Sequence, residues 1–299
     1  MKELHKTILI FLCSLFAGIA LSFVIFTLNK NSNTAITKTP QRIISLAPNV
    51  TETICELGLK HKLIARSDFC NSPPEILSLP SAGNNVTPNF ELMIKLKPDV
   101  IFIQGKNESI KSFCNTYGIK LVSVDMDSIT SIFKEIELIG TVLDVKTRSL
   151  ELIKKLKSQI NGFIKKNKSA NPPKVLVITG RRTDTLTGIF TVGEKSFLSE
   201  AIEIAGGINI FKGESINYAT VSIESVIKKS PDIIIEISMN NEFSKETKIA
   251  MLKQWSMHPT INAVKNNRIY FCTENYILIP GPGIIKTIAL FGKIINTAQ

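Results

Sequence analysis

Short apolar runs alternate with amphipathic helical stretches from about residue 42 to the end of the chain. The apolar runs are rich in β-branched residues and predict strands at 42–46, 63–66, 100–103, 121–124, 175–178, 233–235 and 269–271. Residues recurring at helical spacing predict helices at 50–58, 89–97, 109–117, 196–205, 223–229 and 284–295. This alternation favours an α/β fold with mainly parallel sheets and helices on both faces.

Residues 89–101 and 222–234 are near-copies of each other without a gap. Each copy has a helix-capping residue, a glutamate two positions later, a Pro-Asp pair that ends the helix, and a β-branched strand. The glutamates, Glu91 and Glu224, are 133 positions apart, far too long a period for a solenoid. The repeat therefore predicts two related, Rossmann-like α/β lobes, each with one glutamate at the same structural position.

A long helix is predicted between the two lobes, over residues 145–166. At about 1.5 Å per residue it reaches about 33 Å, the width of a small lobe, and it allows only small hinge motion. The predicted organisation is an N-terminal signal or anchor with a tether at 1–40, an N-terminal lobe at 41–143, the connecting helix at 144–168 and a C-terminal lobe at 169–299.

Residues 8–28 form an uncharged apolar stretch with lysines on both sides. Its 21 residues are long enough to span a bilayer core of about 30 Å. The Gly18-Ile19-Ala20 segment is a poor signal-cleavage site, which favours an uncleaved membrane anchor over a cleaved signal. In either case the chain from about residue 40 is predicted to be extracytoplasmic, in the periplasm or on the outer face of the cytoplasmic membrane.

The composition is that of a globular protein, with 44% hydrophobic and 20% charged residues in 299. The formal net charge of +11 is compatible with nucleic acid or anionic lipid as a partner. The lysines, however, are spread along helices and form no cluster with aromatic residues, which favours solvated helix faces and no nucleic-acid partner.

The predicted exported part contains four cysteines and two histidines. Cys55 and Cys114 lie in amphipathic helical patterns and are predicted to be buried free thiols. Whether Cys70 and Cys272 form a disulfide stays open. Two histidines are too few for a zinc or manganese receptor, so no metal site or cofactor is predicted.

Several motifs resemble substrate-binding proteins that feed ABC importers of vitamin B12 and ferric siderophores. In chain order they are residues 42–52 (RIISLAPNVTE), 68–75 (DFCNSPPE), 96–101 (LKPDVI), 206–211 (GGINIF) and 221–224 (VSIE). The resemblance runs from about residue 41 to the C-terminus. It implies two lobes joined by one rigid helix, a ligand cleft between them, and delivery of a corrinoid to a permease dimer with its ATPase subunits. A ferric siderophore or haem is the alternative ligand.

The resemblance implies that Glu91 and Glu224 dock onto arginines of the permease subunits. A carboxylate in the first turn of a helix also complements the helix dipole, by about 0.3–1 kcal/mol, which is the simpler interpretation of each glutamate alone. That simpler interpretation does not explain why the whole segment recurs. Two equivalent lobes that face two equivalent subunits favour docking.

Ligands of parallel sheets lie outside the carboxyl ends of the strands. The predicted ligand-binding residues in such loops are Cys70, Asn84, Asn85, Arg181, Asn275 and Tyr276, with Tyr218 in the loop before the second repeat helix. By resemblance, Asn85, Tyr218 and Tyr276 lie where aromatic residues contact the corrin, and Asn85 departs from that pattern. Arg181 and Arg182 form either an anion site or a solvated surface pair.

An enzyme is the main competing class, since two α/β lobes around a cleft also describe many transferases. The chain lacks a GxGxxG motif after a strand, a GxxxxGK[ST] loop and a GxSxG elbow. No histidine is placed beside a plausible nucleophile. We therefore predict that the protein is not an enzyme, with an exported α/β enzyme or a tethered sensor as the alternatives from other classes.

Overall fold

The computed structural model of the chain describes residues 39–214, 217–238 and 243–297. Residues from Pro40 onward belong to one compact unit. The apolar stretch at 8–28, predicted to be a membrane anchor, lies outside the described residues. Within the described ranges, no helix has both the length and the apolar character needed to cross a membrane.

The N-terminal lobe is built on a four-stranded parallel sheet with the strand order β2-β1-β3-β4. Its strands are β1 (Ile43–Ser45), β2 (Leu63–Ala65), β3 (Val100–Gln104) and β4 (Lys120–Val124). Its helices are α2 (Pro48–Glu56), α3 (Phe90–Leu96) and α4 (Glu108–Tyr117), with short 3-10 helices η1 (Lys60–Lys62) and η2 (Pro74–Ser78).

The C-terminal lobe has a sheet in the order β10-β9-β5-β6-β8, with β7 also paired to β5. Its strands are β5 (Lys174–Gly180), β6 (Ile189–Val192), β7 (Ile208–Asn209), β8 (Tyr218–Val221), β9 (Ile233–Ile237) and β10 (Ile269–Cys272). Its helices are α7 (Phe197–Ile204), α8 (Ile223–Lys229), α9 (Lys245–Ser256), α10 (Asn262–Lys265) and α11 (Ile284–Asn296), with the 3-10 helix η3 (Asn275–Leu278). The predicted two-lobed α/β fold with mainly parallel sheets is confirmed.

Strands β6 and β8 run antiparallel to their neighbours, and the sequence analysis did not predict them. Tyr218 begins β8, so the prediction that it lies in a loop is wrong. The reason is physical: no residue of β8 is buried and β6 contains the exposed Phe190, so neither is the continuous buried apolar run that marks the predicted strands.

The repeated Pro-Asp pair sets the register of the central strands in both lobes. The Asp99 carboxylate accepts hydrogen bonds from the backbone N–H groups of Gln41 and Arg42, just before β1. In the same way, the Asp232 carboxylate accepts one from the backbone N–H of Lys174, at the start of β5. Each aspartate thus ends a repeat helix and fixes the neighbouring strand.

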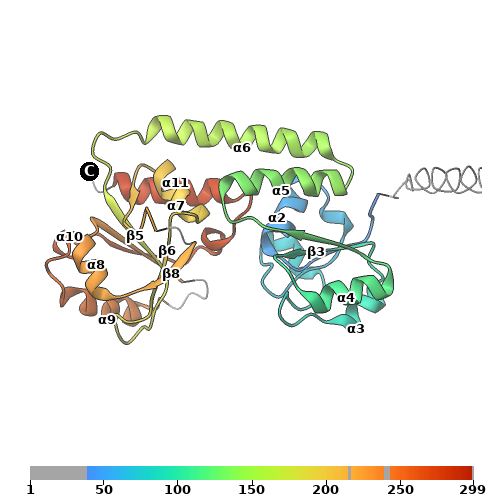
Figure 1. Cartoon of the computed structure of the whole chain (residues 1–299), viewed down its shortest axis with the longest axis horizontal. Coiled ribbons are helices and arrows are strands. Elements are labelled where there is room, and N and C mark those ends of the chain that lie inside the picture. The colour runs from blue at the N-terminus through green and yellow to red at the C-terminus, as the bar shows by residue number, and fades with distance from the viewer. Residues whose placement is uncertain (1–38, 215–216, 239–242, 298–299) are drawn as a thin grey trace, which may run out of the picture. The chain divides into compact units, whose positions relative to one another are not determined.

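The chain leaves the N-terminal lobe through α5 (Ile129–Val142), which packs on α2, and reaches the C-terminal lobe through α6 (Lys146–Lys166), which forms where the helical pattern predicts it. Helix α6 packs on α5, α7 and α11 and therefore touches elements of both lobes (Figure 1). One continuous core cluster includes strand residues of both sheets, such as Ile43 and Val175, together with Leu156 of α6. This shared core holds the lobes together.

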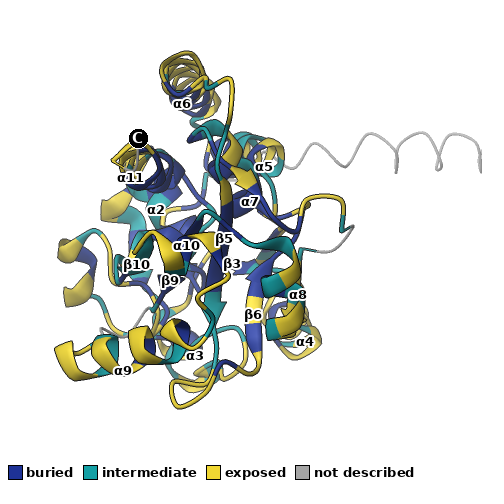
Figure 2. Ribbon diagram, turned by 90° about the vertical axis from the view of Figure 1, so that its left-hand side faces the viewer, coloured by how far each residue is buried: buried dark blue, intermediate teal, exposed yellow. Residues whose placement is uncertain are grey.

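The other face of each sheet has its own core cluster. Along the strands, successive residues alternate between the two clusters: Ile101 packs outward and Phe102 packs toward the shared core. Both faces are therefore buried, as parallel sheets require. Figure 2 shows the dark blue strands inside and exposed residues on α6 and α9 outside. All the residues of these clusters lie between 43 and 295, so we expect residues 40–299 to fold without the N-terminal segment.

Candidate functional site

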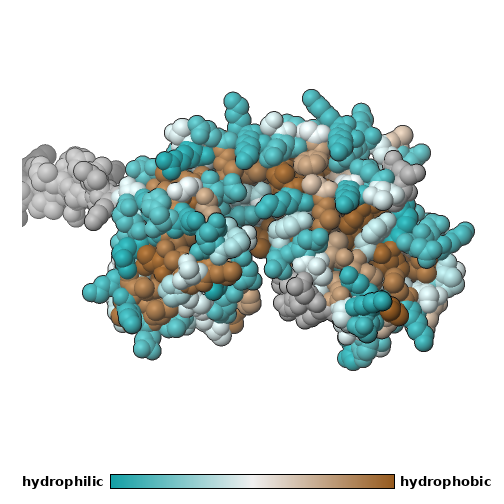
Figure 3. Space-filling view, turned by 180° about the vertical axis from the view of Figure 1, so that it is seen from behind, coloured by the Kyte–Doolittle hydropathy of each residue, from teal (hydrophilic) through white to brown (hydrophobic). Residues whose placement is uncertain are grey.

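A pocket of about 220 Å³ is lined by side chains of both lobes. The N-terminal lobe contributes Pro48, Glu52, Phe69, Asn71 and Ser72, and the C-terminal lobe contributes Asn275, Tyr276, Ile279 and Lys286. The pocket is smaller than the about 300–1,000 Å³ typical of sites that enclose a ligand. A hollow also lies between the lobes below the edge that α6 forms (Figure 3). We infer that a bulky ligand would place only one edge in this pocket.

Phe69 is the most exposed aromatic side chain that lines the pocket, at 63%. Its loop is fixed by Asp68, whose backbone N–H donates to the Gly83 carbonyl and whose carboxylate accepts from Ser81 and Asn84. From this loop, Cys70 is the predicted ligand-binding residue, and Phe69 is not among the predicted residues. An aromatic residue in a polar loop directly after a strand was the signal that pointed to it.

Tyr276 and Asn275 belong to η3, in the C-terminal lobe. Tyr276 is half-buried, and burial raises its pKa, with nearby Glu274 adding to the shift. The Lys286 ammonium lies 5.9 Å from the centroid of the Tyr276 ring. Asn275 is exposed. The structure thus brings both predicted residues into the pocket shared by the lobes, and it adds a cation that the sequence analysis did not identify.

Glu52 crosses from the N-terminal lobe to the C-terminal lobe, where its carboxylate accepts a hydrogen bond of 3.1 Å from the Gly283 N–H. A Cβ atom at Gly283 would lie 2.6 Å from a carboxylate oxygen of Glu52, so glycine permits this close approach. Burial raises the pKa of Glu52, and the hydrogen bond from Gly283 and the charge of Lys286 oppose that shift. A partly desolvated carboxylate therefore forms one wall of the pocket.

Tyr218 lies elsewhere in the C-terminal lobe and stacks on Phe190 of β6, with 5.8 Å between the ring centroids. Both rings are partly exposed, at 38% and 40%. Burial raises the pKa of Tyr218, which a hydrogen bond with Ser196 opposes. The neighbouring Asn217 donates to the carboxylate of Asp127, in the loop between β4 and α5. Tyr218 therefore lies next to a hydrogen-bonded contact between the lobes, although it does not line the shared pocket.

The predicted residues Asn84 and Asn85 mainly build the loop that precedes α3. The side-chain oxygen of Asn84 accepts hydrogen bonds from the backbone N–H groups of Val86 and Thr87. The side-chain amide of Asn85 donates to the Gln104 carbonyl, at the end of β3. The Asn85 Oδ1 atom is buried and has no hydrogen-bond partner among the described residues. Binding of a ligand by either residue stays a prediction.

Cys70 is fully buried, which corrects the prediction that it lines the cleft. Its Sγ lies 3.1 Å from the hydroxyl of Thr51 and 3.4 Å from that of Ser67, within the core of the N-terminal lobe. Cys70 and Cys272 are both free thiols, and burial raises the pKa of Cys272 to about 12. Of the two helical cysteines, Cys114 is a buried thiol as predicted and Cys55 is half-buried.

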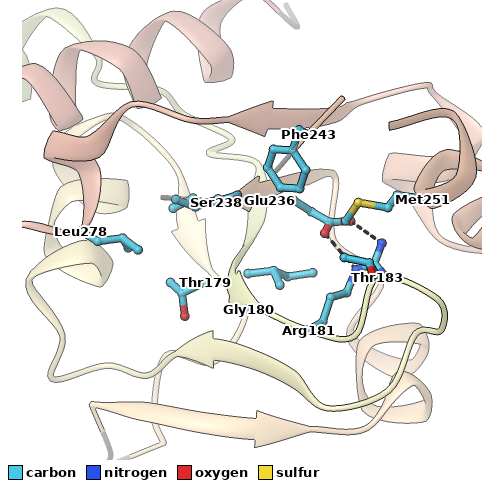
Figure 4. A pocket seen from close by; sticks show the side chains of 11 residues that line it. Thr179, Gly180, Arg181, Thr183, Glu236, Ser238, Phe243, Met251 and Leu278 are labelled. Carbon is cyan, nitrogen blue, oxygen red and sulfur yellow. Dashed lines mark hydrogen bonds and ion pairs between the residues drawn. The ribbon is translucent and has the colours of Figure 1, made fainter. Parts of the chain in front are cut away.

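Arg181 is also buried, because it forms an ion pair with Glu236 of β9, 2.9 Å from nitrogen to oxygen. The two side chains are 1% and 2% exposed, and the pair is bidentate (Figure 4). The indole N–H of Trp255 donates to the same carboxylate at 2.6 Å. The guanidinium is therefore already satisfied, which argues against the predicted anion site. Arg182 is exposed and pairs with Asp184.

These buried groups form the base of a second pocket, of about 170 Å³, at the carboxyl ends of β5 and β9. Figure 4 shows Thr179 and Ser238 to the left of the linked Arg181 and Glu236. Arg181 also donates to the backbone carbonyls of Arg182 and Thr185. Its structural effect is to hold the loop after β5 in place.

Glu91 and Glu224 are both exposed in the first turns of α3 and α8. The predicted caps Asn89 and Ser222 accept hydrogen bonds from backbone N–H groups at the third position of each helix. A hydrogen bond from Ser222 lowers the pKa of Glu224, so this carboxylate is ionised at neutral pH. The two repeated glutamates are thus accessible to a partner, while docking itself stays a prediction.

No cluster of three histidine, cysteine, aspartate or glutamate side chains suited to a metal ion occurs in the ranges that the structure describes. The chemistry that the site offers is recognition: aromatic faces, amides, one ammonium group and one carboxylate around a space between two lobes.

A family model described as "Periplasmic binding protein" matches residues 43–276. The chain therefore belongs to the periplasmic binding protein family. Similar proteins include an uncharacterized ABC transporter substrate-binding lipoprotein, YvrC, from Bacillus subtilis, which is 26% identical over 86% of this chain and 80% of the relative. A high-affinity heme uptake system protein, IsdE, from Staphylococcus aureus is 27% identical over 86% of this chain and 88% of the relative.

The chain is also similar to a vitamin B12-binding protein of Vibrio cholerae, with 24% identity over 87% of this chain and 90% of that protein. The solved structure of the periplasmic vitamin B12-binding protein BtuF from that organism has a TM-score of 0.70 to this chain, covering 87% of this chain and 98% of the other. The likeness extends to both lobes and confirms the predicted two-lobed fold.

Proposed function

We propose that this chain is the substrate-binding component of an ABC importer, which captures a bulky metal chelate between its lobes and delivers it to a membrane permease. The observation that carries the proposal is the pocket shared by both lobes, with Phe69 on one side and Tyr276 on the other. Relatives named for vitamin B12, for heme and for ABC transport support it. We further infer an extracytoplasmic location with residues 8–28 as the anchor.

The favoured ligand is a corrinoid. Flat aromatic side chains suit a large planar ring, and the phenolic hydroxyl of Tyr276 adds a polar contact. The rim of a corrin carries many amide groups, and Asn71 and Asn275 present amides from opposite lobes of the same pocket. A corrinoid would thus have its edge in the pocket and its remaining surface in the open hollow.

Haem is the second candidate, because Lys286 places an exposed ammonium group beside the Tyr276 ring. Haem carries two carboxylates that a lysine can bind, whereas the amides of a corrinoid are neutral. Tyrosine oxygen can also ligate haem iron. The Lys286→Gln variant should weaken binding of haem more strongly than binding of cyanocobalamin, whose one anionic side group is the phosphate of its nucleotide loop.

The direct test is a titration of residues 40–299 with cyanocobalamin, haem and several ferric siderophores, following the fluorescence of Trp255. This residue is the only tryptophan in the chain and is fully buried, so its emission reports a single environment. We expect cyanocobalamin to bind at micromolar concentration or tighter. Binding of haem or of one siderophore alone would select the alternative ligand, and binding of none would contradict the proposed function.

Glu91 and Glu224 are proposed to dock onto the paired permease subunits, each able to accept a bidentate arginine. The Glu91→Arg/Glu224→Arg double variant should lose ligand uptake in cells while the purified domain keeps its affinity. Glu108 and Glu246 offer a matched control, because they are exposed first-turn glutamates of the adjacent helices α4 and α9. Equal loss of uptake in Glu108→Arg/Glu246→Arg would show a general charge effect and refute specific docking.

A further inference from the structure

Helix α6 carries more than half of the chain's excess positive charge. Its 21 residues contain six lysines and one arginine against one glutamate, a net charge of +6 in a chain of +11. All seven cationic side chains are exposed. Lys146 pairs with Glu137 at 3.3 Å, and the Lys157 ammonium lies 5.2 Å from the Phe133 ring centroid. These contacts leave most of the charge of the helix facing solvent.

Lysines and exposed apolar residues are interleaved along one side of α6. We call this side the basic strip, formed by Lys146, Leu150, Lys154, Lys157, Ile164 and Lys165. Spacings of three and four residues between the first four members keep them on one side of the helix. Leu150 and Ile164 are 45% and 48% exposed. Figure 3 shows hydrophilic side chains projecting along the edge that α6 forms.

The buried side of α6 fixes the orientation of this strip. Leu152, Leu156 and Ile160 are buried in the core that both lobes share. The helix therefore cannot rotate to hide its lysines or its exposed apolar residues. A preformed surface of this kind binds a partner without the cost of ordering a flexible segment.

We propose that the basic strip binds the anionic headgroups of a phospholipid bilayer. Each lysine near an anionic membrane surface strengthens binding by about fivefold. The exposed Leu150 and Ile164 favour a bilayer over a bare phosphate polymer, because apolar side chains gain from contact with the acyl boundary. The apolar stretch at 8–28, which predicts a membrane anchor, would tether the folded part of the chain to a membrane. This inference does not depend on the ligand or on the importer.

Vesicle co-sedimentation of residues 40–299 tests the proposal, since this part has its own core and lacks the apolar stretch. The wild type should bind vesicles of phosphatidylglycerol and phosphatidylcholine in equal parts, more weakly at high salt, and should not bind pure phosphatidylcholine. The Lys154→Glu/Lys157→Glu/Lys165→Glu variant should bind roughly 100-fold more weakly or worse.

The control variant Lys95→Glu/Lys120→Glu/Lys245→Glu makes the same change in net charge at exposed lysines outside α6. It should keep at least most of the vesicle binding. Equal loss in both triple variants, with unchanged thermal unfolding, would overturn the strip as the binding surface. Absence of binding by the wild type would overturn the proposal itself.

The Leu150→Ser/Ile164→Ser variant distinguishes a membrane from a phosphate polymer. We expect it to weaken binding to vesicles severalfold and to leave any binding of soluble polyphosphate unchanged. If polyphosphate binds the wild type as tightly as vesicles do and the serine variant has no effect, the partner is a phosphate polymer and the membrane proposal is wrong.

Discussion

The buried Arg181–Glu236 pair predicts a large and strongly non-additive effect of mutation. Replacing Glu236 with leucine leaves a guanidinium that is 1% exposed without its countercharge, and it leaves the Trp255 indole N–H without its acceptor. Breaking a buried ion pair by removing one partner costs about 3–5 kcal/mol, and an unpaired buried donor costs about 1–3 kcal/mol. We therefore expect Glu236→Leu to lower the free energy of unfolding by at least about 4 kcal/mol.

The Arg181→Leu variant should lose about 3–5 kcal/mol, because it leaves the carboxylate of Glu236 buried and unpaired. The double variant contains neither charge, and its loss should be only about 1–3 kcal/mol, from the unpaired indole N–H and the carbonyls of the loop after β5. The double variant should thus be more stable than either single variant.

Urea unfolding of residues 40–299, followed by circular dichroism, measures all four proteins without relying on the altered surroundings of Trp255. A double variant that loses the sum of the two single losses would contradict this prediction, because it would mean that the two charges do not stabilise each other.

Three further predictions concern stability and loop order. Because burial raises the pKa of Glu52, ionisation of this side chain disfavours the folded state. The Glu52→Gln variant should therefore raise the free energy of unfolding at pH 7, and this gain should shrink as the pH falls toward 4.5. A constant gain across that pH range would contradict the prediction. The Asp68→Ala variant removes the carboxylate that accepts hydrogen bonds from Ser81 and Asn84. Amide hydrogen exchange should therefore become faster in residues 83–88, and the free energy of unfolding should fall by about 1–2 kcal/mol. Unchanged exchange would contradict the proposal that Asp68 orders this loop. A Cβ at Gly207 would lie 2.7 Å from the Val175 side chain, so Gly207→Ala should destabilise the folded protein by about 1–3 kcal/mol in thermal unfolding. Gly162 is exposed on α6 and has no atom near its Cβ position, so Gly162→Ala should stabilise the folded protein by about 0.5–1 kcal/mol.

Much of the fold could be predicted from local sequence because its determinants are local. The caps Asn89 and Ser222, the Pro-Asp pairs and the period of α6 each act within a few residues. Strands β6 and β8 could not be predicted in this way. Their pairing depends on partners 26 to 32 residues away, and their partly exposed residues do not form a continuous apolar run.

The candidate site was predicted only in part, for a related reason. Strand ends correctly drew attention to the loops of Asn275 and Tyr276. The burial of Arg181 depends on its ion pair with Glu236, which is 55 residues away, and the local sequence around Arg181 does not predict that pair. Cys70 and Phe69 are adjacent, and only packing decides that the thiol faces the core while the ring faces the cleft.

The proposed function requires that a ligand is held between the lobes, in contact with one aromatic side chain from each lobe. The most direct measurement compares ligand affinities of Phe69→Ala, Tyr276→Ala and the control Tyr117→Ala, whose side chain is 53% exposed on α4 outside the pocket. Each pocket variant should weaken binding by about 1–2 kcal/mol, or roughly 5- to 30-fold, and the control should leave it unchanged. Unchanged affinity in both pocket variants would contradict the claim.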